Sequence, residues 1–141
     1  MTKSSRFVVA THCLTLLAYG EGEAMTSDYI AGSVNTNPVV VRRILSLLAK
    51  AGLIVTQEGS GGGVRLAKAA SKIDLRTVFA AVDSEDLFAP HPQDPNPLCP
   101  VGSAIKTILE PTLDAAAEAL LGTLAETSVA ELLRRVKRLS R

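Results

Sequence analysis

The chain has 141 residues, 47% of them hydrophobic and 21% charged, with two cysteines and no tryptophan. This length suits one compact domain, with or without an oligomerisation arm, and the apolar content excludes a disordered chain. Cys13 and Cys99 are too few and too far apart to indicate a disulfide framework, which favours the cytoplasm. No apolar run approaches the ~18 residues of a transmembrane helix, so we expect no membrane association.

The positive charge is concentrated in one part of the chain. The net charge is +1, from 15 basic and 14 acidic residues, which taken alone argues against a nucleic-acid-binding protein. Residues 35–66 nevertheless hold four basic side chains and one acidic side chain, whereas residues 67–100 hold three basic and five acidic ones. Whether this local positive charge indicates nucleic-acid binding depends on the helices and strands that carry it.

Three helices are predicted in the first part of the chain. Apolar spacing of three and four residues places the first over residues 5–19. Thr26 or Ser27 can cap a short second helix. The apolar side of this second helix is expected to hold Tyr29, Ile30 and Val34. The third helix has the clearest start, because Asn37 is a favourable N-cap and Pro38 suits the first helical position; it is expected to reach about residue 51.

A strand pair and three further helices are predicted after the third helix. Residues 53–57 and 64–66 suit two short strands joined by a glycine-rich turn, and Asp74 can cap a fourth helix over residues 75–82. Five prolines in residues 90–100 indicate a loop. Residues 101–124 suit one long helix, which Pro111 is expected to kink, and a last amphipathic helix with a basic tail is expected over residues 128–139.

This order of elements is that of a winged helix-turn-helix. We predict a mainly α fold with a small β-hairpin wing and a long dimerisation helix. Residues 1–83 are assigned to a winged helix-turn-helix DNA-binding domain, residues 84–100 to a Pro-rich loop and residues 101–141 to C-terminal dimerisation helices. In such a fold a helix fits the major groove of double-stranded DNA, while the hairpin tip reaches phosphates or the minor groove.

One side of the third helix and the wing supply the candidate DNA contacts. Arg42 and Arg43 can reach guanine edges or phosphates, Val39 can touch a thymine methyl group, and Arg65 suits a narrow minor groove. The full predicted set is Asn37, Val39, Arg42, Arg43, Ser46, Lys50, Ser60 and Arg65. Each feature alone can also be an ordinary solvated helix face or a flexible turn. Their order within one short stretch favours DNA binding.

The chain resembles the Rrf2 family of bacterial winged-helix transcription regulators. The likeness rests on NPVVVRRILSLLAKAGLI at residues 37–54, GSGGGVRL at 59–66, IDLRTVFAAVD at 73–83 and CPVG at 99–102. It implies a homodimeric DNA-binding regulator, usually a repressor, in which the long helix pairs two subunits. Independently of the resemblance, that helix carries a broad apolar strip, made up of Ile105, Ile108, Leu109, Leu113, Ala116, Ala117, Leu120 and Leu124. Two-fold pairing predicts a pseudo-palindromic operator.

The loop before the long helix departs from the family pattern. Members that hold an iron–sulfur cluster carry three cysteines there, whereas this loop offers only Cys99 and His91. We therefore expect no cofactor and no metal site. Cys99 is either a redox- or ligand-sensing thiol near a helix N-terminus or a small, partly buried apolar residue, and the second interpretation is favoured. The effector, whether a redox or a small-molecule signal, stays open.

Two functions of other classes remain as alternatives. The glycine loop meets neither the P-loop nor the G-x-G-x-x-G spacing, and no catalytic constellation is present, so a small enzyme is the less favoured of the two. The other is a winged-helix module for protein contacts, in which the basic side faces an acidic partner. Steep salt dependence of binding separates DNA recognition from protein recognition.

Overall fold

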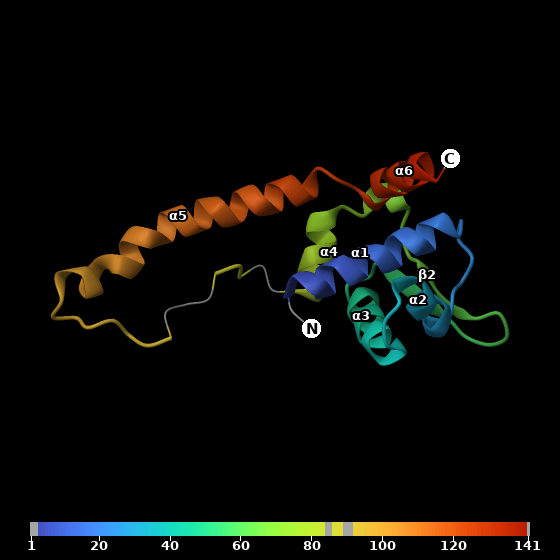
Figure 1. Cartoon of the computed structure of the whole chain (residues 1–141), viewed down its shortest axis with the longest axis horizontal. Coiled ribbons are helices and arrows are strands. Elements are labelled where there is room, and N and C mark those ends of the chain that lie inside the picture. Colours follow the sequence, from blue (N-terminus) through green and yellow to red (C-terminus); the bar gives the residue numbers. More distant parts are fainter. Residues whose placement is uncertain (1–2, 84–85, 89–91, 141) are drawn as a thin grey trace.

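The computed structural model describes residues 3–83, 86–88 and 92–140. Its elements in chain order are α1 (Lys3–Tyr19), α2 (Ser27–Val34), α3 (Pro38–Lys50), β1 (Ile54–Gln57), β2 (Gly63–Leu66), the 3-10 turn η1 (Ala70–Lys72), α4 (Leu75–Val82), α5 (Pro100–Ala125) and α6 (Val129–Leu139). Figure 1 shows a body of short helices with a hairpin, from which α5 extends to one side. The predicted class, mainly α with a small β-hairpin, is confirmed.

Side-chain caps set the starts of four helices. The Asn37 Oδ1 accepts a hydrogen bond from the Val39 amide at 2.8 Å, and Pro38 is the first residue of α3. Thr26 caps α2 in the same way, through the Tyr29 amide at 3.1 Å. Asp74 caps α4 and Ser128 caps α6. Each cap satisfies an amide that has no partner inside its own helix, which explains why these boundaries were readable from the sequence.

The core joins α1, α3 and α4, and α6 completes it. Leu14 and Leu17 of α1 belong to one buried cluster with Ile44 and Leu48 of α3 and Val78 of α4. Cys13 is also fully buried here. Aliphatic side chains fill nearly the whole core because the chain has few aromatic residues.

The exposure of Tyr29 corrects one expectation. The sequence placed it on the apolar side of α2, yet 62% of its surface is exposed, whereas Ile30 and Ala31 are buried. Adjacent residues on a helix point about 100° apart, so a helix of only two turns can bury Ile30 and still expose its neighbour.

The two C-terminal helices lie in different surroundings. Leu121 is the one buried residue of α5, and most of that helix extends away from the body (Figure 1). In contrast, α6 packs on α1 and η1, and its Val129 enters the core. The expectation had grouped residues 101–141 as dimerisation helices, but the contacts within one chain associate α6 with the winged-helix body. The physical reason is that α1 and η1 cover part of the apolar side of α6, where Val129 is buried and Leu132 and Leu133 are half-buried.

Pro111 lies inside α5, which continues as one helix from Pro100 to Ala125. Pro111 has no amide hydrogen, so one hydrogen bond of the helical ladder is absent there. Parts of the predicted Pro-rich loop, including His91, lie outside the described residues. None of the helices in the described segments is long and apolar enough to cross a bilayer.

Candidate nucleic-acid interface

The exposed side of α3 carries the predicted polar stripe. The buried side is formed by Val41, Ile44, Leu45 and Leu48. The opposite side is exposed and carries Val39, Arg42, Arg43, Ser46 and Lys50. This arrangement follows from the helical period, because residues three and four apart share one face. The stripe is therefore available to a partner that approaches α3 from solvent.

Asn37 has a structural task at the start of this helix. Its Oδ1 accepts the Val39 amide, so that oxygen is already occupied by the cap. The Val40 and Val41 amides bond to the Asn37 carbonyl and Pro38 has no amide hydrogen, so the first turn of α3 offers a partner the positive end of the helix dipole and no free amide. Such a helix end favours a phosphate group. Asn37 thus contributes to the candidate interface by capping the start of α3.

The wing is held next to the segment that precedes α2. β1 and β2 pair antiparallel, with Val55 opposite Arg65. Val64 extends this pairing to Met25, through hydrogen bonds of 2.8 Å and 2.9 Å between their backbones. Gly63 makes this approach feasible, because a Cβ atom at that position would overlap the Met25 carbonyl group. The side chains of Ser60 in the turn and Arg65 on β2 are exposed.

The candidate interface occupies one side of the molecule. α1 contacts both α3 and α6, and in Figure 1 α2, α3 and the hairpin lie below α1 while α6 lies above it. α1 therefore lies between α3 and α6 (Figure 1). A partner that approaches from the side of α3 and the wing can contact both of them, whereas α6 lies on the other side of α1 (Figure 1).

The charges on this side are unevenly compensated. Arg42 lies 3.9 Å from Asp28 of α2, and both side chains are largely exposed. No carboxylate among the described residues forms an ion pair with Arg43, Lys50 or Arg65. Three cations thus face solvent without a counter-charge, which favours a polyanionic partner.

Two residues of this surface were missed by the sequence reading. Asp28 and Tyr29 lie in the first turn of α2, and the Asp28 carboxylate lies 3.9 Å from the Arg42 guanidinium of α3. The sequence placed Tyr29 on the apolar side of α2. The Thr26 cap fixes where α2 begins but not which side of it is buried, so it gave no signal for the exposure of Tyr29.

The two cysteines lie in unlike environments. Cys99 precedes α5 as its N-cap residue, makes no side-chain cap bond and is exposed, so the favoured interpretation as a partly buried apolar residue is wrong. The start of α5 lies away from the body of short helices (Figure 1). Burial instead raises the pKa of the Cys13 thiol to about 12. Within the described segments no three potential metal ligands gather in one place.

Comparison with known proteins decides the family. A sequence model described as "Iron-dependent Transcriptional regulator", that of Rrf2, matches residues 3–135. The chain belongs to the Rrf2 family. It is 42% identical over 131 residues to a protein named as the HTH-type transcriptional regulator YwnA of Bacillus subtilis strain 168, covering 92% of this chain and 96% of YwnA.

Solved structures agree with this assignment. A crystal structure described as that of a DNA-binding protein superposes with a TM-score of 0.72 at 36% identity, covering 91% of this chain and 98% of the other. IscR of T. potens superposes with a TM-score of 0.69 at 18% identity, covering 100% and 92%, and it shows the shared fold. The protein is thus an Rrf2-type transcriptional regulator and not an enzyme.

The residues of this chain do not fit an iron–sulfur cluster. A cluster needs several thiolate ligands around one centre. Of the two cysteines in the chain, Cys13 is enclosed in the core while Cys99 is exposed at the start of α5. These two thiols cannot converge without unfolding α1. The iron dependence in the family description therefore has no matching ligand set here.

Proposed function

We propose that this regulator represses transcription by binding a pseudo-palindromic operator as a homodimer. The observation that carries the proposal is the uncompensated basic side of α3 next to the anchored wing. A helix of this size fits the major groove, and a narrow hairpin can follow the backbone to the adjacent minor groove. The near-neutral net charge does not oppose this, because phosphates respond to the local field.

Each candidate side chain has a distinct role in this proposal. Arg42 and Arg43 contact guanine edges or phosphates, and Val39 contacts a thymine methyl group. Ser46 and Lys50 hold backbone oxygens along the same groove. At the wing, Arg65 enters a narrow minor groove and Ser60 contacts the backbone. Asn37 caps α3 and so keeps the positive end of its helix dipole in place for a nearby phosphate.

The exposed side of α5 supports the homodimer. Apolar side chains that one chain leaves uncovered include Ile105, Ile108, Leu109 and Leu120, which are 37%, 69%, 43% and 45% exposed. Monomeric proteins rarely expose so long an apolar strip, and a second copy can bury it through a two-fold axis. Operator half-sites are then expected about one or two helical turns apart.

The decisive experiment compares arginine variants on one operator fragment, recovered by genomic footprinting with the full-length protein. Arg43→Ala should weaken binding by roughly 1–3 kcal/mol and relax the base preference at one position of each half-site. Arg65→Ala should weaken binding without changing the major-groove preference. Arg138→Ala is the matched control, because it removes the same charge from α6, across α1 (Figure 1).

Competition shift assays at several salt concentrations supply the readout. The proposal requires a steep loss of wild-type affinity between low and moderate salt, and a shallower slope for each interface variant. If Arg43→Ala, Arg65→Ala and Arg138→Ala all bind like the wild type, α3 and the wing do not form the DNA surface.

The proposal includes a redox or small-molecule signal. Cys99 is the candidate sensing thiol, since it is exposed and lies at the start of the proposed dimer helix. Peroxide, nitrosating agents and electrophiles should then change operator binding by the wild type and leave Cys99→Ser unaffected. Unchanged wild-type binding under all three treatments eliminates Cys99 as a sensor.

A further inference from the structure

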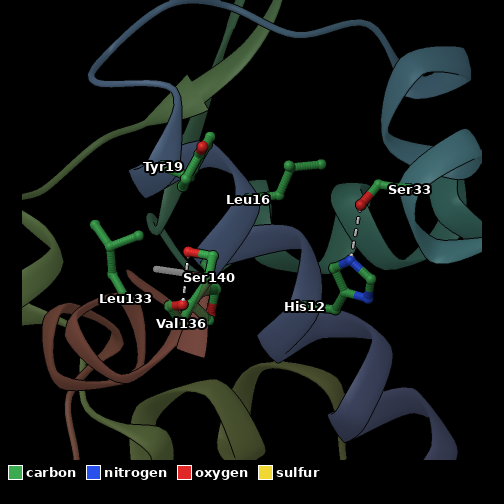
Figure 2. Close-up of a pocket in the computed structure, with 8 residues that line it drawn as sticks. His12, Leu16, Tyr19, Ser33, Leu133, Val136 and Ser140 are labelled. Carbon is green, nitrogen blue, oxygen red and sulfur yellow. Dashed lines mark hydrogen bonds between the residues drawn. The ribbon is translucent and has the colours of Figure 1, made fainter. Parts of the chain in front are cut away.

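A groove of about 340 Å³ lies between α1, the end of α2 and α6 (Figure 2). This volume is at the lower end of the range for small-molecule sites, which is roughly 300–1,000 Å³. The groove lies on elements far apart in the chain, since His12, Ser33 and Val136 all line it. No part of the candidate DNA surface on α3 or the wing contributes to its lining.

The two ends of the groove differ in chemistry. Figure 2 shows His12 and Ser33 together at one end, with Nε2 and Oγ 2.9 Å apart. Leu133 and Val136 of α6 lie at the other end, and Leu16 of α1 lies between the two ends. The groove is thus mainly aliphatic, with the His12–Ser33 pair at one end, while the Ser140 hydroxyl at the other end donates to the Val136 carbonyl at 3.0 Å.

The residues that line the groove favour an uncharged ligand. Apart from His12, the side chains that line the groove are aliphatic, hydroxyl-bearing or phenolic, and none is an aspartate, glutamate, lysine or arginine. A charged molecule would lose hydration without gaining a counter-charge from the groove lining. An apolar molecule would remove solvent from Val136 and Tyr19, which are 44% and 56% exposed.

We propose that this groove binds a small, uncharged, largely apolar molecule with one hydrogen-bonding group, held at the His12–Ser33 pair. The pair has capacity for such a group, because a serine hydroxyl supplies one donor and two acceptor sites and only part of this is used by His12. The apolar portion of the ligand lies against Leu16, Leu133 and Val136.

The position of the groove gives the ligand a route to DNA binding. Ser33 belongs to the last turn of α2, a few residues before the Asn37 cap of α3. On the other side, α6 follows the proposed dimer helix α5 after a short connection. A bound molecule therefore contacts both the helix-turn-helix and the segment that leads from the dimer helix. This regulatory part rests on the proposed function, whereas ligand binding itself does not.

Three matched probes test the ligand class on the full-length protein without DNA. The probes are p-cresol, p-xylene, which replaces the hydroxyl by a methyl group, and 4-methylbenzoate, which replaces it by a charged group. Titrations followed by ¹H–¹⁵N spectra should show saturable shifts with p-cresol at His12, Ser33 and Val136. Binding of p-xylene should be at least about tenfold weaker, and 4-methylbenzoate should cause no saturable shift in the groove.

Two variants localise the binding. Ser33→Ala removes one partner of the polar pair, and Val136→Trp fills the apolar end; both residues are exposed, so the fold should persist. Each should lower p-cresol affinity at least about fivefold, whereas Ser71→Ala on η1 should leave it unchanged. An unliganded spectrum that matches the wild type away from the substitution verifies folding.

Specific outcomes overturn the proposal. It fails if p-cresol causes no saturable shift in the groove at millimolar concentration, or if p-xylene or 4-methylbenzoate binds as tightly. It also fails if Ser33→Ala and Val136→Trp bind p-cresol as the wild type does. Operator affinity with and without p-cresol is measured separately, so failure of the DNA proposal cannot be mistaken for failure of the groove.

Discussion

Gly63 of the wing packs so closely on Met25 that a Cβ atom on the glycine would overlap the Met25 carbonyl group. Two backbone hydrogen bonds between Met25 and Val64 lie directly beside this contact. The hairpin is therefore attached to the segment before α2 as well as to itself. This attachment sets the position of Arg65 relative to α3.

The first prediction is that Gly63→Ala detaches the wing. Gly63 has a φ of +142°, and its replacement must also displace backbone atoms, so the free energy of unfolding should fall by about 1–3 kcal/mol. Operator affinity should fall as well, because Arg65 shifts with the strand. Urea denaturation and shift assays measure the two effects.

Gly61→Ala is the matched control for that change. Gly61 also has a positive φ, +77°, but nothing lies within 4 Å of its Cβ position. Gly61→Ala should therefore lower the free energy of unfolding only through the strained backbone conformation, by about 1–2 kcal/mol at most. If Gly63→Ala is no more destabilising than Gly61→Ala, the contact with Met25 does not hold the wing.

The second prediction concerns Asp28, which lies 3.9 Å from Arg42. Asp28→Asn should tighten binding to DNA several-fold at low salt, because a negative charge near the phosphates is removed. Stability should change by less than about 1 kcal/mol, since the pair is exposed. Asp114→Asn on α5 makes the same change in net charge and should leave DNA affinity unchanged. Equal effects of the two variants would mean that Asp28 is not near the DNA.

The third prediction addresses the α5 strip. Leu109→Glu places a charge in the centre of the proposed dimer contact and should produce a monomer at micromolar concentration in sedimentation experiments. Thr107→Glu lies on the opposite side of the helix by the helical period and should remain dimeric. A wild-type chain that sediments as a monomer contradicts the homodimer directly.

The fourth prediction separates the two thiols. Because burial raises the pKa of Cys13 to about 12, the native protein at pH 8 should react with a thiol reagent at Cys99 alone. Both cysteines should react in guanidinium chloride. Rapid modification of Cys13 in the native state would show that α1 opens far more often than its packing indicates.

The raised pKa of Cys13 also predicts that the free energy of unfolding falls as the pH rises above 9. The unfolded Cys13 thiol ionises near its ordinary value of 9.0, whereas the folded one ionises near 12. The buried, neutral thiol thus contributes fully to the free energy of unfolding below pH 9. This contribution is lost as the pH rises from 9 to about 12. Denaturation experiments at pH 8 and pH 10.5 test this. The free energy of unfolding should fall less between these two pH values for Cys13→Ala than for the wild type.

The sequence by itself determined the order and the starts of the helices. Asn37, Asp74 and Ser128 cap their helices through bonds to amides two or three residues away, and such signals are local. The exposed stripe of α3 follows equally from local spacing, because the same period that buries Ile44 exposes Arg43. The predicted candidate contacts on α3 needed no knowledge of distant residues.

Only the tertiary structure decided which surfaces are covered. Tyr29 and Cys99 are both exposed, although their residue types suggested burial, because no distant segment packs over them. α6 lies on α1 rather than along α5, and this packing forms the groove that joins His12, Ser33 and Val136. Caps and helical periods act within about four residues, whereas burial depends on segments that meet only when the chain has folded.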